Sequence, residues 1–210
     1  MKYQLRDYQK KASDAAVMCF KMKSGRNGLL VLPTGAGKSL IIADIAARLE
    51  EPLIVFQPNK EILEQNFAKL QTYGIWDCSI YSASVGRKEI SRITFATIGS
   101  VIRHMKDFQH FKNILIDECH LVKPSDGMYK RFFEQAERRI VGLTATPYRL
   151  YSCMNGSMLK FLTRTRPRVF SQVLYYCQVS ELLAKGFLSR LKYYDVTRID
   201  LSKVRRNSSG

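Results

Sequence analysis

The chain has 210 residues, of which 46% are hydrophobic, enough to bury the core of one domain with an additional segment. No run approaches the roughly 18 apolar residues of a membrane-spanning helix, and residues 1–7 lack a secretory apolar core. We therefore expect a cytoplasmic protein with no membrane partner. The net charge of +16 suggests a polyanionic partner, because Lys and Arg release counterions when they bind phosphates; a merely soluble basic surface is the alternative.

The five cysteines are scattered, odd in number and never spaced as metal ligands. They predict reduced, mostly buried thiols and no structural zinc.

Short apolar runs alternate with amphipathic helical patterns, which predicts an α/β fold with a largely parallel central sheet flanked by helices. The apolar runs predict strands at 28–32, 53–56, 93–96, 113–116 and 140–143. Helices are expected from a glycine-rich turn to about residue 50, after the second strand, and over 128–138. In the helix after the second strand, one face is formed by Ile62, Leu63, Asn66, Phe67 and Leu70.

The composition changes after residue 150, where residues 151–210 contain 11 Lys and Arg but only 3 Asp and Glu. A short helix is expected at 181–185, ended by Gly186, with a possible strand at 191–196 and a disordered tail at 207–210. Arg164, Arg166 and Arg168 are candidates for phosphate contacts, although a solvated basic loop explains them equally well.

The first predicted strand leads into a glycine-rich turn and a helix, the order that a phosphate-binding loop requires. The turn consists of Pro33, Thr34, Gly35, Ala36, Gly37, Lys38 and Ser39. The two glycines allow backbone N–H groups to converge on phosphate oxygens, and we expect Lys38 to neutralise the β- and γ-phosphates and Ser39 to ligate Mg²⁺. The generic pattern has a glycine where this chain has Leu32. An ordinary turn before Lys-Ser is the alternative.

A later apolar run, 114–116, ends abruptly in two adjacent carboxylates, Asp117 and Glu118. Carboxylates at the end of a buried strand are costly unless a metal ion or a water molecule uses them. We expect Asp117 to hold Mg²⁺ and Glu118 to orient and deprotonate the attacking water. Alone, such a pair is typical of a solvated strand end; together with the phosphate loop it indicates ATP hydrolysis.

Residues 33–39, 117–120 and 144–147 resemble motifs I, II and III of superfamily 2 helicases. They occur in that family's order and spacing, and the resemblance covers about residues 4 to 150. Residues 5–9 and 142–149 look most like the branch that contains restriction-enzyme motor subunits and repair translocases. The resemblance implies a RecA-like P-loop NTPase domain over residues 1–150, followed by a basic extension over 151–210.

The resemblance implies further roles. Gln9 is expected to read the adenine edge, with Arg6 close to the base or ribose; a solvent-facing helix residue is the alternative for Gln9. Thr144 and Thr146 would couple hydrolysis to movement of a partner domain, through His120. A strand end stopped by proline is the alternative for that motif. Cys119, where many relatives carry Ala, departs from the family pattern, and we assign it no redox role.

Two loops that follow predicted strands, residues 57–60 and 96–100, resemble motifs Ia and Ib. They should lie at the sheet edge where open α/β folds bind ligands. The family uses these loops to grip the sugar–phosphate backbone, which implies contacts from Pro58, Asn59, Lys60, Thr97 and Ser100. Helix capping is an equal alternative for Asn59 and Ser100.

Members of the family have a second RecA-like domain whose arginines complete the ATP site. Residues 151–210 are fewer than the roughly 150 typical of a domain, so we expect that partner domain to be absent from this chain. Arg205 and Arg206 lie in a polar tail without the pattern expected of arginine fingers. Because such fingers contribute about 10³ to 10⁵ in rate, we predict binding of Mg-ATP with very slow hydrolysis.

The leading hypothesis is therefore the first motor domain of an ATP-dependent helicase or translocase that binds nucleic acid, DNA in preference to RNA. A non-catalytic nucleotide- or nucleic-acid-binding regulatory module is one alternative, which the intact Lys38, Asp117 and Glu118 disfavour. A P-loop ATPase acting on another kind of substrate is the second, which Gln9, the motif Ib loop and the Thr-Ala-Thr-Pro sequence disfavour.

Overall fold

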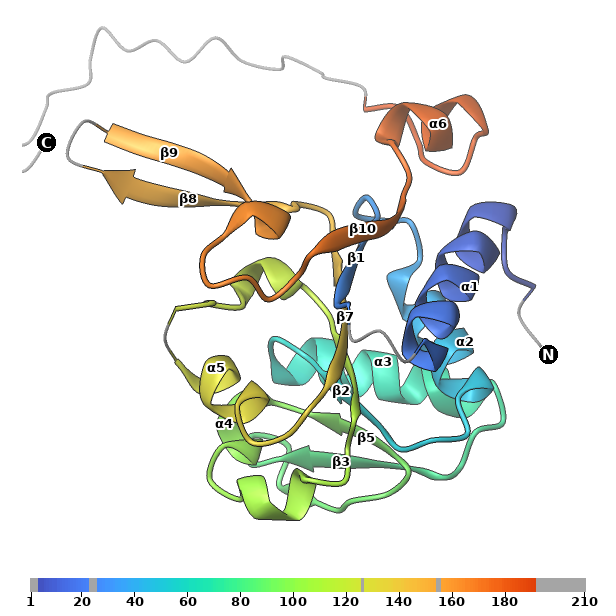
Figure 1. Ribbon diagram of the computed structural model, residues 1–210. Helices are drawn as coiled ribbons and strands as arrows, with labels where there is room; N and C mark the ends of the chain where they lie inside the picture. The colour runs from blue at the N-terminus through green and yellow to red at the C-terminus, as the bar shows by residue number, and fades with distance from the viewer. Residues whose placement is uncertain (1–3, 23–25, 126, 154–155, 192–210) are drawn as a thin grey trace, which may run out of the picture.

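The computed structural model describes residues 4–22, 26–125, 127–153 and 156–191, and its central feature is a sheet of eight strands. The strand order is β10-β1-β7-β6-β2-β5-β3-β4, and neighbours are parallel except for β3 and β4. The strands are β1 (Gly28–Val31), β2 (Leu53–Phe56), β3 (Cys78–Ser82), β4 (Arg87–Lys88), β5 (Ile93–Ala96), β6 (Asn113–Ile116), β7 (Arg139–Thr144) and β10 (Gln172–Tyr176). A separate antiparallel hairpin, which projects from the domain in Figure 1, consists of β8 (Tyr148–Cys153) and β9 (Gly156–Phe161).

Helices cover both faces of this sheet (Figure 1). One core receives side chains from α1 (Asp7–Lys21), α2 (Lys38–Arg48), α3 (Lys60–Thr72) and α6 (Val179–Ala184). The opposite core receives side chains from α4 (Ile98–Val101), α5 (Met128–Phe133) and the 3₁₀ turns η1 (Met105–Phe108), η2 (Cys119–Leu121) and η3 (Leu162–Arg164). No helix in the described part of the chain is long and apolar enough to cross a membrane.

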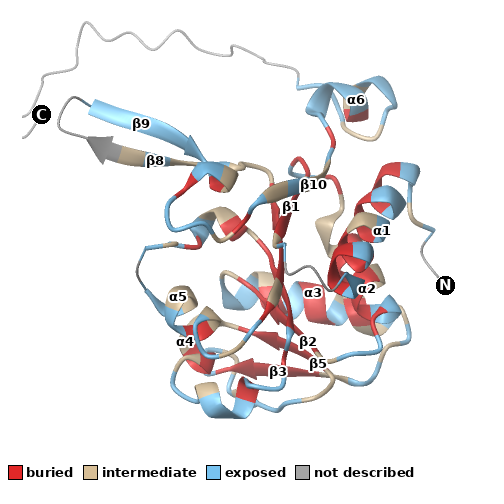
Figure 2. Ribbon diagram, viewed as in Figure 1, coloured by how far each residue is buried: buried red, intermediate tan, exposed pale blue. Residues whose placement is uncertain are grey.

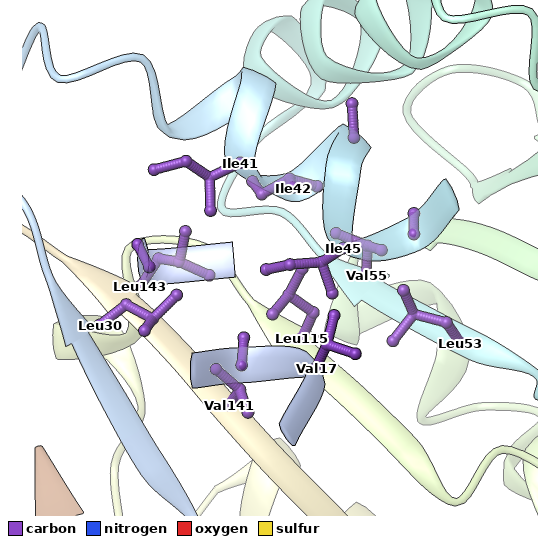
Figure 3. Close-up of a cluster of buried hydrophobic side chains, with 14 of the residues drawn as sticks. Val17, Leu30, Ile41, Ile42, Ile45, Leu53, Val55, Leu115, Val141 and Leu143 are labelled. Atoms are coloured by element: carbon purple, nitrogen blue, oxygen red, sulfur yellow. The ribbon is translucent and has the colours of Figure 1, made fainter. Parts of the chain in front are cut away.

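Successive residues of the central strands alternate between the two cores. In β2, Leu53 and Val55 face one core, whereas Ile54 and Phe56 face the other. A strand with both faces buried reads as a continuous apolar run, and Figure 2 shows the central strands buried accordingly. Figure 3 shows side chains of α2 packed on those of the strands; burial of each contributes about 1.5–3 kcal/mol.

The structure confirms the five predicted strands and the α/β class, but it corrects two helix boundaries. The helix predicted to reach residue 50 ends at Arg48, and that predicted over 128–138 ends at Phe133. Beyond the end of the second helix, Arg138 is buried. Its guanidinium donates to the carbonyls of Phe108 and Phe111 and lies 3.9 Å from the ring centroid of Phe132.

The C-terminal extension joins the main sheet. Its strand β10 pairs in parallel with β1 at the sheet edge, and Leu182 of α6 is buried in the core beneath α1 and α2. The short helix predicted before Gly186 is confirmed as α6, with Gly186 at φ +69°. The domain division at residue 150 stays a prediction. The strand suggested at 191–196, Arg205, Arg206 and the tail fall outside the described residues, apart from Leu191, which lies outside any strand.

Candidate active site

The predicted phosphate loop connects β1 to α2 at the carboxyl edge of the sheet. Gly35 and Gly37 have φ values of +81° and +76°, which side chains with a Cβ rarely adopt. Leu32, which replaces the generic glycine, is fully buried, and its N–H donates to the Thr144 carbonyl at 2.9 Å. Leu32 therefore continues the hydrogen bonding of β1 with β7 by one residue, and its side chain belongs to the core. Lys38 and Ser39 follow in the first turn of α2, where unpaired backbone N–H groups favour anions.

The three predicted motifs meet through a continuous set of polar contacts. Lys38 Nζ lies 2.7 Å from Glu118 Oε1, and Glu118 Oε2 lies 3.3 Å from His120 Nδ1. His120 Nδ1 is also 3.0 Å from the hydroxyl of Thr144, which in turn accepts a hydrogen bond from the Thr146 N–H. His120 Nδ1 therefore lies within reach of both the Glu118 carboxylate and the Thr144 hydroxyl. The structure thus brings together the predicted catalytic and coupling residues.

Asp117 is held by a buried polar network. Its side chain accepts hydrogen bonds from the Glu118 N–H at 3.0 Å and from Asn66 Nδ2 at 3.2 Å, and Asn66 Nδ2 also donates to Gln57 Oε1 at 3.1 Å. Burial raises the pKa of the Asp117 carboxyl, and the Lys38 ammonium works in the opposite direction. Among the described residues, Gln57 Nε2 and Asn66 Oδ1 are buried without a protein partner.

Asn66 and Gln57 were not predicted as site residues. The available signal was a polar side chain on the otherwise apolar face of α3, since Asn66 is buried beside Leu63, Phe67 and Leu70. A buried amide needs hydrogen-bond partners, which the sequence pattern does not identify.

The residues predicted to hold Mg²⁺ suit that ion chemically. Mg²⁺ prefers oxygen ligands and is bound through one or two carboxylates together with phosphates and waters. Lys38 is engaged by Glu118, which leaves the buried Asp117 carboxylate without a direct ion pair among the described residues. A divalent cation would offset the cost of desolvating that charge. The buried Asp117 carboxylate therefore fits the group, and the predicted second ligand, the Ser39 hydroxyl, is an oxygen of the kind that Mg²⁺ prefers.

Gln9 packs directly against the phosphate loop. Its side chain is only 3% exposed, so a solvent-facing position is excluded. Gln9 Nε2 donates to the Ala36 carbonyl at 2.9 Å, and its Oε1 accepts from the Arg6 N–H at 2.9 Å. Tyr8, to which the sequence analysis assigned no role, donates through its hydroxyl to the same carbonyl at 2.9 Å. Contact of Gln9 and Arg6 with adenine stays a prediction.

A cavity of about 960 Å³ lies at the carboxyl edge next to the two carboxylates. All five residues predicted to grip nucleic acid line it, together with Asp117, Glu118 and three further basic side chains. The five are Pro58, Asn59, Lys60, Thr97 and Ser100; the basic residues are Lys88, Arg103 and Lys123. The motif Ia and Ib loops therefore form one groove, although the structure does not test their contact with nucleic acid.

Of the two residues for which helix capping was the alternative, Asn59 is a helix cap and Ser100 is not. Asn59 caps α3, because its Oδ1 accepts the Ile62 N–H at 2.9 Å. Ser100 instead accepts the Ala83 N–H at 2.9 Å and shares a hydrogen bond with the Thr97 hydroxyl. The Thr97 and Ser100 hydroxyls are thus hydrogen-bonded within the groove wall.

Cys119 packs against Gly142, and the absence of a side chain at Gly142 leaves room for the thiol. A Cβ added at Gly142 would lie 2.6 Å from the Cys119 sulfur and 2.8 Å from Phe170. Cys119 is buried, which raises its pKa well above the ordinary thiol value, so the thiol is an unreactive packing group.

The chain is similar to known proteins in sequence and in fold. Residues 2–149 match the model of a family described as type III restriction enzyme, res subunit. The DNA 3'-5' translocase XPB2 of Sulfurisphaera tokodaii is 29% identical over 151 residues, covering 70% of this chain and 32% of that protein. The DNA 3'-5' helicase XPB of Mycobacterium tuberculosis is 29% identical over 154 residues, covering 69% of this chain and 27% of that protein. The chain thus spans about a third or less of these relatives.

A solved structure with the same fold is the UvsW helicase from bacteriophage T4. It matches with a TM-score of 0.56 at 22% identity and covers 69% of this chain and 54% of that one. At this identity the likeness shows the fold alone. It confirms the RecA-like arrangement that the resemblance implied.

Proposed function

Because the chain belongs to the family of the type III restriction enzyme res subunit, we propose that it is the first RecA-like motor domain of an ATP-dependent helicase or nucleic-acid translocase. The observation that carries this proposal is the contact series from Lys38 through Glu118 and His120 to Thr144. It joins the phosphate loop to a carboxylate and then to a strand end, as a nucleotide-driven motor requires.

The chemistry follows from the ion pair between Lys38 and Glu118. In the chain without nucleotide, Glu118 neutralises Lys38. The phosphates of ATP compete for the same ammonium, and their binding releases Glu118 to orient and deprotonate a water molecule. Asp117 and Ser39 would hold Mg²⁺, which would supply positive charge to the phosphate oxygens. The residues thus divide into a phosphate ligand, a base and metal ligands.

The groove beside the carboxylates takes the sugar–phosphate backbone of a nucleic acid. Lys60, Lys88, Arg103 and Lys123 outnumber the carboxylates in its lining, which are Glu61, Asp117 and Glu118. Contacts to phosphates are independent of sequence. The net charge of +16 favours the same partner. We propose DNA in preference to RNA, in keeping with the names of the two relatives described above.

Efficient hydrolysis requires a second RecA-like domain that supplies arginines to the γ-phosphate. Such groups contribute about 10³ to 10⁵ in rate in related phosphoryl-transfer enzymes. The 210-residue chain by itself is expected to bind Mg-ATP and to turn it over slowly.

The test is equilibrium binding and steady-state hydrolysis of ATP, with and without single- and double-stranded DNA and RNA. Lys38→Ala should abolish binding, whereas Lys112→Ala, which removes an exposed lysine before β6, serves as the matched control. Lys38-dependent binding with slow turnover supports the proposal. Absence of nucleotide binding contradicts it, and brisk turnover without a partner domain contradicts the requirement for that domain.

A further inference from the structure

The C-terminal extension reaches back to the phosphate loop. β10 pairs with β1, and the N–H of Cys177 donates to the Val31 carbonyl at 3.0 Å, close to where the loop begins. Leu182 of α6 is 1% exposed, in the core shared with α1 and α2. Sheet pairing and side-chain burial therefore hold the extension beside the candidate nucleotide site.

The turn after α6 directs the following residues toward α1. Gly186 has φ +69° and donates its N–H to the Leu183 carbonyl at 3.1 Å, while Phe187 donates to the Leu182 carbonyl at 2.8 Å. These two bonds form the Schellman pattern, which ends a helix and reverses the chain. Figure 1 shows α6 near one end of α1.

Phe187 supports the guanidinium of Arg6. The Cζ atom of Arg6 lies 4.2 Å from the centroid of the Phe187 ring, and the ring of Tyr8 lies 5.7 Å from the same centroid. Leu188 covers the phosphate loop, because a Cβ added at Gly35 would lie 3.0 Å from its Cδ2. The extension thus touches both the start of α1 and the loop.

Arg6 is placed so that a second flat group can stack on it. Its side chain is exposed, and within the described residues it forms no ion pair. A planar guanidinium can stack on π systems through two faces, and the Phe187 ring contacts the guanidinium of Arg6 from one side. Gln9, whose Oε1 accepts the Arg6 N–H, lies next to it against the loop.

We propose that Phe187 holds the Arg6 guanidinium as a stacking surface for the base of the bound nucleotide, which makes the extension part of the ATP site. This inference rests on the proposed function, since it requires a nucleotide at the phosphate loop. Phe187 acts through Arg6 and is a positioning residue. Its contribution is directed to the base and ribose side of the ligand, whereas Lys38 serves the phosphates.

The test compares a nucleotide with a ligand that lacks base and ribose. Titration calorimetry on the 210-residue chain measures the Kd of Mg-ATP and of Mg-tripolyphosphate for the wild type and for Phe187→Ala. Phe187→Ala should raise the Kd of Mg-ATP by about 3- to 10-fold, in the range of a cation–π contact. The Kd of Mg-tripolyphosphate should stay unchanged, and Phe187→Tyr, which keeps the ring, should behave as the wild type.

Two further variants separate positioning from folding. Phe161→Ala makes the same change at an exposed phenylalanine of β9 and should alter neither Kd. Arg6→Ala combined with Phe187→Ala should bind Mg-ATP no more weakly than Arg6→Ala alone, because both residues act through one surface.

The outcomes distinguish this inference from the function on which it rests. An equal loss of Mg-ATP and Mg-tripolyphosphate binding in Phe187→Ala would overturn it, as would unchanged Mg-ATP binding. A wild-type chain that binds neither ligand in a Lys38-dependent way would refute the proposed function as well, and that result needs no Phe187 variant.

Discussion

The ammonium of Lys38 and the carboxylate of Glu118 lie 2.7 Å apart, although the two residues are separated by 80 positions in the sequence. They belong to the phosphate loop and to the acidic pair at the end of β6, so the contact joins the two halves of the candidate catalytic centre. Both side chains are largely buried, with exposures of 13% and 25%. Each charge of the pair is neutralised by the other, whereas the function proposed above requires Lys38 and Glu118 to act separately once ATP binds.

Glu118→Gln should therefore tighten binding of Mg-ATP. The substitution removes the charge that competes with the phosphates for Lys38, and we expect the Kd to fall by about 2- to 5-fold, as for a partly exposed ion pair. Hydrolysis assisted by a partner domain should be lost, since an amide cannot take the proton of water. Titration calorimetry measures the Kd, with Glu64→Gln on the exposed side of α3 as the control. Weaker binding by Glu118→Gln would contradict the competition.

His120→Ala should uncouple the nucleotide from the nucleic acid. His120 contacts both Glu118 and Thr144, so its loss breaks the connection while leaving each binding surface in place. The measurement is the anisotropy of a labelled oligonucleotide with and without a non-hydrolysable ATP analogue. In the variant, the analogue should change the affinity for the oligonucleotide little or not at all. The Kd of the oligonucleotide alone and the Kd of the analogue alone should stay near the wild-type values.

The control for His120 is His110→Ala, which alters an exposed histidine outside the groove. A His120 variant that retains the wild-type coupling factor would exclude a coupling role.

Asn66→Ala should lower the free energy of unfolding by about 1–3 kcal/mol, because it leaves buried oxygens of Asp117 and Gln57 without their donor. Urea denaturation measures this change. Gln65→Ala, at the exposed neighbouring position, should stay within about 0.5 kcal/mol of the wild type. Equal effects of the two substitutions would show that the buried network contributes nothing to stability.

The pKa of Asp117 predicts a pH dependence of folding in the absence of Mg²⁺. Burial raises this pKa above the ordinary carboxyl value. At a pH between the ordinary and the raised pKa, the folded chain therefore holds a proton that the unfolded chain has released. The contribution of Asp117 to the free energy of unfolding must then fall as the pH rises from about 4 through the raised pKa.

Asp117→Asn supplies the reference for this measurement, since it has no titrating group at that position. Urea denaturation over a pH series should show the difference in stability, wild type minus Asp117→Asn, decreasing as the pH rises. A difference that increases with pH would mean that the folded-state pKa of Asp117 is lowered.

Much of the fold and of the site could be predicted because the relevant patterns are local. The strands buried on both faces are continuous apolar runs, and the phosphate loop is a contiguous strand, turn and helix start. β10 escaped prediction since it is an edge strand whose residues are all at least partly exposed. β3 escaped because Ser79 and Ser82 interrupt its apolar pattern, although both are buried and hydrogen-bonded within the fold.

The sequence by itself determined the backbone of the phosphate loop, the acidic strand end and the order of the motifs, since each depends on neighbouring residues. Only the tertiary structure decided that Asn66 holds Asp117 and that Phe187 supports Arg6. Such contacts join segments that are distant in the chain. The physical reason is that hydrophobic periodicity reports which face of an element is buried, whereas the partner of a buried polar or aromatic group is set by how the elements pack in space.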